Sequence, residues 1–176
     1  MEEQDIPTCL SIYRANEEHF PPGHFEYFEK SLRNGGFVTL IATRNDQPVG
    51  FCGLCHETTK TGRIALLCYG IVTPTHYRSG IGTAQLLTRI ALITPVSDLT
   101  YATMLAVPNS VPFYRRFGFD FSRDATAEDG RVYPFGMLKI SQRFIEDCRT
   151  TLARRNITYP DVRDKIPERV HHLAKH

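Results

Sequence analysis

Two closely spaced glycines lie between a long apolar run and an amphipathic stretch, in a segment whose residue types could bind phosphate. Residues 72–83 read Val-Thr-Pro-Thr-His-Tyr-Arg-Ser-Gly-Ile-Gly-Thr. Gly80 and Gly82 have no Cβ atom, so the main chain there can approach a ligand closely. If a helix follows, its first amides point to one spot at the positive end of the helix. A pyrophosphate suits such a nest of amides.

Two familiar nucleotide-binding motifs do not fit this segment. A Walker loop needs Gly-Lys-Ser/Thr, which the sequence lacks, and a dinucleotide fingerprint needs a third glycine where Gln85 stands. The pattern that remains is x-x-Gly-x-Gly. The alternative interpretation is a tight strand–helix turn in which the glycines serve backbone geometry alone.

A second segment, residues 107–119, reads Val-Pro-Asn-Ser-Val-Pro-Phe-Tyr-Arg-Arg-Phe-Gly-Phe. In this order and at this separation, the two segments resemble the hallmark motifs of the GNAT superfamily of acyl-CoA-dependent N-acetyltransferases. These are an acetyl-CoA cradle and a short helix that carries Phe-Tyr and ends in Gly-Phe. The resemblance covers about residues 37–140 and, more loosely, residues 5–33. The chain departs from the family at Tyr77, usually Gln or Arg, and at Val107, often Asn.

This resemblance implies transfer of an acetyl group from acetyl-CoA to a primary amine, by direct attack in a ternary complex. Tyr114 would be the general acid, because a phenol can protonate the departing thiolate; the alternative is a core tyrosine that packs the helix on the sheet. Asn109 has the alternative role of a helix N-cap. The residues implied to bind acetyl-CoA are Ile71, Val72, Tyr77, Arg78, Ser79, Gly80, Ile81, Gly82, Thr83, Asn109 and Tyr114.

The acceptor side is less defined. Many family members carry the general base on the strand equivalent to residues 66–69, which here read Leu-Leu-Cys-Tyr. His56 and Glu57 are the nearest titratable residues, with an exposed strand end as the alternative, so the base stays unassigned. Residues 5–33 would cover the acceptor, and their aromatic and acidic residues suit a cationic amine or simply form two amphipathic helices. These residues are Phe20, His24, Phe25, Tyr27 and Phe28, with Glu17, Glu18, Glu26 and Glu29.

Two other functions compete. Residues 52–56 match the C-x-x-C-H pattern of haem attachment. Two observations argue against haem. The sequence shows no export signal, and the pattern lies in an expected strand, where residues three apart point to opposite faces and could not hold one ligand together. Since no second cysteine pair completes a zinc site, we expect no metal. The second competitor is a GNAT fold that binds acyl-CoA without catalysis, as a sensor or assembly module.

Hydrophobic patterns place these motifs in an α/β (α+β) fold with a mostly antiparallel central sheet flanked by helices. The first strand of the family is expected to be missing, because Met1 lies only four residues before the first helix. Residues 1–140 would form the acyltransferase domain, and residues 141–176 a helical extension of the same domain. The expected strands are 37–42, 49–55, 64–72, 100–107, 119–123 and 131–140, and the expected helices are 5–20, 25–32, 83–93, 110–117 and 141–155.

Composition sets the remaining expectations. The 176 residues are 41% hydrophobic and 23% charged, as in one globular domain. An odd number of cysteines, five, without an export signal indicates reduced thiols and a cytoplasmic protein. No apolar run of about 18 residues exists, so we expect no membrane contact. No block of like charge predicts nucleic-acid binding. The sheet edge left by the missing strand predicts a homodimer.

Overall fold

The computed structural model describes residues 5–59, 62–94, 100–127 and 130–170. Residues 1–4 and 171–176, which belong to the two expected ranges 1–140 and 141–176, lie outside the described residues. The α-helices are α1 (Ile6–Arg14), α2 (His24–Arg33), α3 (Ile81–Ala91), α4 (Val111–Arg115) and α5 (Gln142–Arg154). The strands are β1 (Val38–Arg44), β2 (Gln47–Thr59), β3 (Gly62–Val72), β4 (Thr100–Leu105), β5 (Asp120–Thr126), β6 (Val132–Ile140) and β7 (Glu168–Val170).

The strands form one seven-stranded sheet in the order β1-β2-β3-β4-β6-β5, with β7 also paired to β2. Most neighbours are antiparallel, and only the β3–β4 and β2–β7 pairs are parallel. The predicted fold class is therefore confirmed. The predicted elements also match closely, except that the first helix ends at Arg14 rather than near Pro21, and a short 3-10 turn follows at Glu17–His19.

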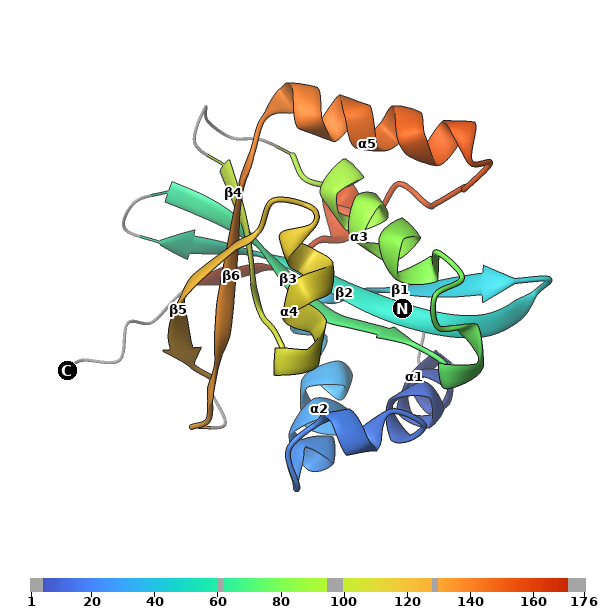
Figure 1. Cartoon of the computed structure of the whole chain (residues 1–176), viewed down its shortest axis with the longest axis vertical. Coiled ribbons are helices and arrows are strands. Elements are labelled where there is room, and N and C mark those ends of the chain that lie inside the picture. The colour runs from blue at the N-terminus through green and yellow to red at the C-terminus, as the bar shows by residue number, and fades with distance from the viewer. Residues whose placement is uncertain (1–4, 60–61, 95–99, 128–129, 171–176) are drawn as a thin grey trace.

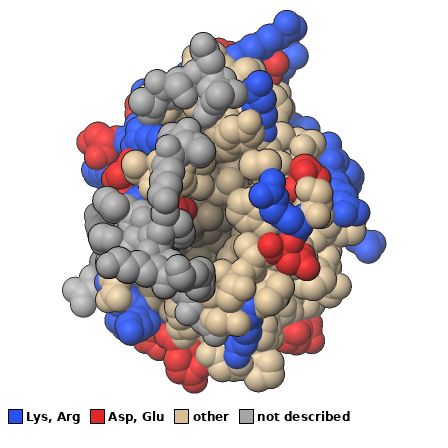
Figure 2. Space-filling view, turned by 90° about the vertical axis from the view of Figure 1, so that its left-hand side faces the viewer, with Lys and Arg blue, Asp and Glu red and all other residues tan. Residues whose placement is uncertain are grey.

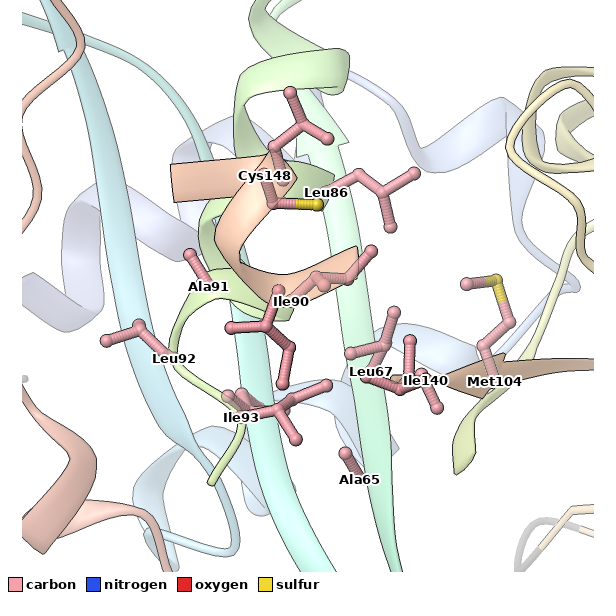
Figure 3. Close-up of a cluster of buried hydrophobic side chains, with 14 of the residues drawn as sticks. Ala65, Leu67, Leu86, Ile90, Ala91, Leu92, Ile93, Met104, Ile140 and Cys148 are labelled. Atoms are coloured by element: carbon pink, nitrogen blue, oxygen red, sulfur yellow. The ribbon is translucent and has the colours of Figure 1, made fainter. Parts of the chain in front are cut away.

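Helices cover both faces of the sheet (Figure 1). Helices α1 and α2 pack on one face over Phe51 and Ile71, and α3 and α5 pack on the other. Figure 3 shows how the second layer is joined: Cys148 of α5 lies beside Leu86 and Ile90 of α3, which in turn lie over β3. The expected C-terminal helix is thus part of the main core.

Strands β3 and β4 pair over only a short distance. Their register joins Ile64–Leu66 to Tyr101–Thr103, whereas β3 continues to Val72 and β4 to Leu105. Beyond the paired residues the two strands share no ladder, so their C-terminal halves separate. This separation opens the sheet from within, next to the start of α3.

A β-bulge lies in the separated half of β3. Cys52 pairs with Gly70 and Gly53 pairs with Cys68, so Tyr69 is the extra residue, and its φ is +38°. A tyrosine seldom adopts this conformation, and strain of this kind persists where packing fixes it. The Tyr69 ring packs on the rings of Phe28 and Phe37, with centroids 4.8 and 5.5 Å away.

The sequence did not predict β7. This three-residue strand runs parallel to β2 at His56–Thr58, beyond the point where β1 stops pairing. It covers the stretch of β2 that β1 does not reach. In the described part of the chain, the outer edge of β1 pairs with no strand.

The surface carries charges of both signs without a block of one sign on the face shown in Figure 2. None of the helices among the described residues combines the length and the apolar character needed to cross a bilayer.

Candidate functional site

The glycine segment forms a turn that leads into α3. Arg78 and Gly80 have φ values of +60° and +87°, and Gly80 is the N-cap of the helix. No side chain caps this helix. The first amides of a helix have no acceptor within it, so those of Ile81, Gly82 and Thr83 are available to a ligand. The turn therefore presents a cradle of main-chain donors, which we call the α3 cradle (residues 78–83).

The two glycines of the α3 cradle differ. A Cβ on Gly80 would meet nothing within 4 Å, but the positive φ disfavours any side chain there. A Cβ on Gly82 would lie 3.8 Å from Cζ of Phe113 on α4, which is ordinary contact. Gly80 thus suits the backbone conformation and keeps the space above it open, whereas Gly82 faces Phe113 of α4 with room for a side-chain carbon.

Tyr77 faces away from the α3 cradle. Its hydroxyl donates to Oδ1 of Asn16, a buried residue after α1, and Nδ2 of Asn16 donates to the Ile12 carbonyl at 2.8 Å. The tyrosine that replaces the family's usual Gln or Arg therefore ties the loop before α3 to the helices on the opposite face of the sheet.

A hollow of about 240 Å³ opens where β3 and β4 separate, and we call it the β3–β4 hollow. Ile71 lines it, and the chain passes from there through Val72 into the α3 cradle. Helix α2, the start of α4 and β7 supply the other walls. The large side chains that line it include Phe20, His24, Tyr27, Tyr69, Tyr114 and Arg169.

Tyr114 is held at the inner wall of this hollow and is only 8% exposed. Its ring packs edge-on against Phe113 and Phe119, with centroids 4.9 and 5.7 Å away. A Cβ on Gly70 would lie 3.0 Å from the Tyr114 hydroxyl, so the hydroxyl reaches the β3 backbone beside the bulge. Gly70 leaves the space that this contact needs.

Arg89 lies behind Tyr114 and was not singled out by its sequence pattern. This α3 residue is 1% exposed, and its Nη2 lies beside the Tyr114 hydroxyl, since a Cβ on Gly70 would lie 3.0 Å from both atoms. Nε donates to the Gln85 carbonyl and Nη1 to the Cys68 carbonyl, both at 3.3 Å. Burial lowers the pKa of the guanidinium, but its neighbours, Cys52 first, raise it by more, so Arg89 is a cation.

The acceptor-side wall contains an imidazole. His24, the first residue of α2, is buried, and its Nδ1 lies 2.7 Å from the Tyr13 hydroxyl. Burial raises the pKa of Tyr13, so that phenol stays protonated. The sequence singled out His24 only as part of an aromatic wall. The helix that aims it into the β3–β4 hollow starts after Gly23, whose φ is +76°.

Several expected residues lie elsewhere. His56 and Glu57 do not line the β3–β4 hollow: β7 covers that end of β2, and the amide of His56 donates to the Pro167 carbonyl. Asn109 is exposed in a 3-10 turn, Ser110 rather than Asn109 is the N-cap of α4, and Asn109 does not line the hollow. None of the expected acidic residues lines the hollow either. These residues are Glu17, Glu18, Glu26 and Glu29.

The cysteines form no ligand set. Cys52 contacts the Gln85 carbonyl on the α3 side, whereas Cys55 lies 3.9 Å from Cys68 between their sulfur atoms. The two thiols of the C-x-x-C-H pattern thus have separate surroundings, as the strand geometry predicted. Within the described ranges, no three His, Cys, Asp or Glu side chains gather as a metal site would require.

The family model for an acetyltransferase (GNAT) domain matches residues 35–120, a range that includes both the α3 cradle and Tyr114. No curated protein matches the chain.

Solved structures share the fold at low identity. A Desulfovibrio desulfuricans protein assigned to the GNAT family aligns with a TM-score of 0.62 at 19% identity, over 80% of this chain and 95% of its own. The ribosomal-protein-alanine N-acetyltransferase of Brucella melitensis aligns with a TM-score of 0.56 at 22% identity, over 80% and 97%. Arabidopsis thaliana NAA60, solved with a bisubstrate analogue, aligns with a TM-score of 0.56 at 17% identity, over 80% and 95%.

Proposed function

Because the chain belongs to the GNAT family of acetyltransferases, we propose that it transfers an acetyl group from acetyl-CoA to a primary amine within a ternary complex. The observation that carries the proposal is the continuity of two features. Gly70 and Ile71 of β3 line the β3–β4 hollow, and the chain continues from the end of β3 through a 3-10 turn at Pro74–His76 to the α3 cradle. A ligand with a pyrophosphate at one end and a reactive group at the other fits that arrangement.

The α3 cradle would hold the pyrophosphate of acetyl-CoA. The free amides of residues 81–83 lie at the positive end of α3, where an anion is stabilised. Arg78 is exposed at the same turn and adds a positive charge. Ile71 and Val72 would flank the pantetheine arm on its way into the hollow. The expected role of Asn109 is not part of this proposal, since its side chain lies outside the hollow.

The chemistry follows from the groups around the hollow. The amine nitrogen attacks the thioester carbonyl carbon and forms the new C–N bond. The C–S bond then breaks, and its electron pair leaves on sulfur. The Tyr114 hydroxyl gives its proton to that sulfur as general acid. The proton lost by the amine passes to His24, because imidazole is the only side-chain type in the hollow's lining whose charge normally changes near neutral pH.

The lining also bears on the acceptor. It is aromatic and includes Arg169 of β7, but it includes no carboxylate. A multiply charged polyamine would therefore find no counter-charge inside the hollow. We propose an amine on a small molecule or peptide whose body next to the amine is apolar or anionic.

The proposal is tested by binding and turnover together. Calorimetry should detect acetyl-CoA binding, and a thiol-specific dye should detect CoA release when amino acids, peptide N-termini, aminoglycosides or polyamines are added. Binding without thiol release for any acceptor would favour the non-catalytic acyl-CoA module instead. Absence of binding would contradict both functions.

The role of His24 has its own test. His24→Ala should lower kcat at neutral pH, with recovery as the pH rises and more of the amine is already unprotonated. An unchanged rate at pH 7 would assign that proton to solvent.

A further inference from the structure

The centre of the molecule contains a positive charge without a counter-charge. Arg89 is 1% exposed, and no Asp or Glu in the described part of the chain forms an ion pair with it. A guanidinium does not lose its proton in a protein. Removing such an ion from water costs several kcal/mol unless its surroundings compensate. A fold rarely retains this arrangement for packing alone.

The partners of Arg89 are all acceptors of its N–H groups. Two are main-chain carbonyls, of Gln85 and Cys68, and the Tyr114 hydroxyl lies next to Nη2 of the same guanidinium. The contact with Tyr114 depends on Gly70, where a Cβ would lie 3.0 Å from both Nη2 of Arg89 and the hydroxyl oxygen of Tyr114. The bulge at Tyr69 and the missing side chain at Gly70 therefore leave room for this pair.

The direction of a hydrogen bond between Arg89 and the neighbouring Tyr114 hydroxyl follows from the groups involved. A guanidinium has donors and no acceptor, so the oxygen of Tyr114 must accept from it. The O–H proton of Tyr114 then points away from Arg89. Tyr114 lines the β3–β4 hollow and Arg89 does not, so Arg89 approaches from behind and the proton points toward the hollow.

We propose that Arg89 is a positioning residue for acetyl transfer, which aims the Tyr114 proton at the leaving sulfur and stabilises the phenolate that forms when the proton departs. This inference rests on the proposed function. In this role Arg89 acts through Tyr114 and contacts neither the acyl donor nor the acceptor.

Arg89 acts at the step in which the C–S bond breaks and Tyr114 gives up its proton. As the C–S bond breaks, its electron pair stays on sulfur, and the Tyr114 proton converts the thiolate to the free thiol of CoA. Tyr114 is briefly a phenolate beside the guanidinium. The proton that His24 takes from the attacking amine returns through solvent and restores the phenol, so no further reactant is needed.

A structural role would look different, and the chain offers a matched comparison. Arg149 of α5 also donates to a carbonyl of α3, that of Ala91, through Nε at 3.1 Å and Nη2 at 2.9 Å. Arg149 does not line the β3–β4 hollow. Arg149→Met should lower the melting temperature and leave kcat unchanged. Arg89→Met, which removes a buried unpaired charge, should lower kcat with little loss of melting temperature.

The test is a double-mutant cycle at saturating acetyl-CoA, with Arg89→Met, Tyr114→Phe and the double variant. Arg89→Met should lower kcat about 10- to 100-fold, the usual effect of losing a hydrogen bond to a charged group, while KM for acetyl-CoA stays within about threefold. In the Tyr114→Phe background, Arg89→Met should cause almost no further loss. Arg89→Lys keeps a charge and should recover part of the rate.

Two results would overturn the inference. One is a near-parent kcat for folded Arg89→Met, and the other is an equal loss with and without the Tyr114 hydroxyl. If Arg89→Met does not fold, Arg89→Gln takes its place, since it keeps donors and removes the charge. Failure of the proposed function is distinguishable, because the parent enzyme would then release no CoA with any acceptor, whatever stands at position 89.

Discussion

At the scale of single residues, Tyr114→Phe removes one hydroxyl and keeps the ring that packs edge-on against Phe113. Loss of a positioned general acid typically lowers the rate about 100- to 10,000-fold. We expect that loss in kcat, with acetyl-CoA affinity and melting temperature close to the parent. Tyr101→Phe, on the paired half of β4, is the control. If Tyr114→Phe retains more than half the parent kcat, Tyr114 is not the acid.

His56 gives a pH-dependent stability. Its imidazole is buried, Nδ1 accepts from Nη2 of Arg63 at 2.5 Å, and Nε2 has no hydrogen-bond partner among the described residues. Burial, and then Arg63, lower the pKa of His56 below 6.5. As the pH falls through about 6.5, the unfolded chain binds a proton that the folded protein rejects, so the free energy of unfolding decreases.

Urea unfolding at pH 7.5 and pH 5.5 checks this expectation. Between pH 7.5 and pH 5.5, the free energy of unfolding should fall by about 1 kcal/mol more in the parent than in His56→Gln. The reason is that glutamine can still accept a hydrogen bond from Arg63 but does not titrate. His19→Gln, at an exposed histidine, controls for the loss of an imidazole. Equal pH dependence in the parent and His56→Gln would contradict the prediction.

At the scale of elements, the start of α3 depends on the positive φ of Gly80. Gly80→Val would place a branched side chain where φ is +87° and over the free amides. We expect acetyl-CoA affinity to fall at least tenfold by calorimetry, which corresponds to about 1.4 kcal/mol. Gly35→Val is a matched control, since Gly35 has φ +63° and its Cβ would also meet nothing within 4 Å. Equal affinity in both variants would rule out the α3 cradle as the phosphate site.

Helix α5 bears on where the domain ends. Leu152 is 0% exposed and packs in the same cluster as the α3 residues. We therefore propose that residues 141–170 belong to the same folding unit as residues 1–140. Leu152→Ala should lower the free energy of unfolding by about 2–5 kcal/mol in one cooperative transition. Val132→Ala, at a mostly exposed residue, should change it little. A second, separate transition would contradict a single unit.

At the scale of the whole molecule, the open edge of β1 supports the proposed homodimer. Among the described residues β1 pairs only with β2, so its outer edge has no strand partner there. Exposed edges favour pairing with another strand. Light scattering at high protein concentration should give a mass near twice 20.1 kDa. A monomer mass there would contradict the dimer.

Local sequence signals predicted most of the fold. Each of the strands β1–β6 is a β-rich run between polar or glycine turns, and the glycine segment marks the start of α3. Strand β7 escaped prediction because three residues carry no periodic pattern and their pairing depends on a contact far along the chain.

The site was predictable only where a motif marks it. Gly80 and Tyr114 stand in recognisable segments, and the structure joins those segments at one end of β3. Arg89 could not be found in this way, because an arginine at that place in an amphipathic helix looks like a surface residue. His24 was predicted only as one member of an aromatic wall over the acceptor, and Arg169 enters the hollow from a segment that no motif connects with it, so tertiary packing is needed to reveal both positions.

The pairing of β7 with β2 also sets when, during synthesis, the sheet is completed. A chain folds as it emerges, N-terminal segments first. His56–Thr58 must wait for their edge partner while many further residues are added, because the hydrogen bond from Thr58 to Glu168 spans 110 positions. An open edge can pair with a neighbouring nascent chain. The edge of β2 at His56–Thr58 can therefore be covered by its own chain only after residues 168–170 have been added and are free to pair.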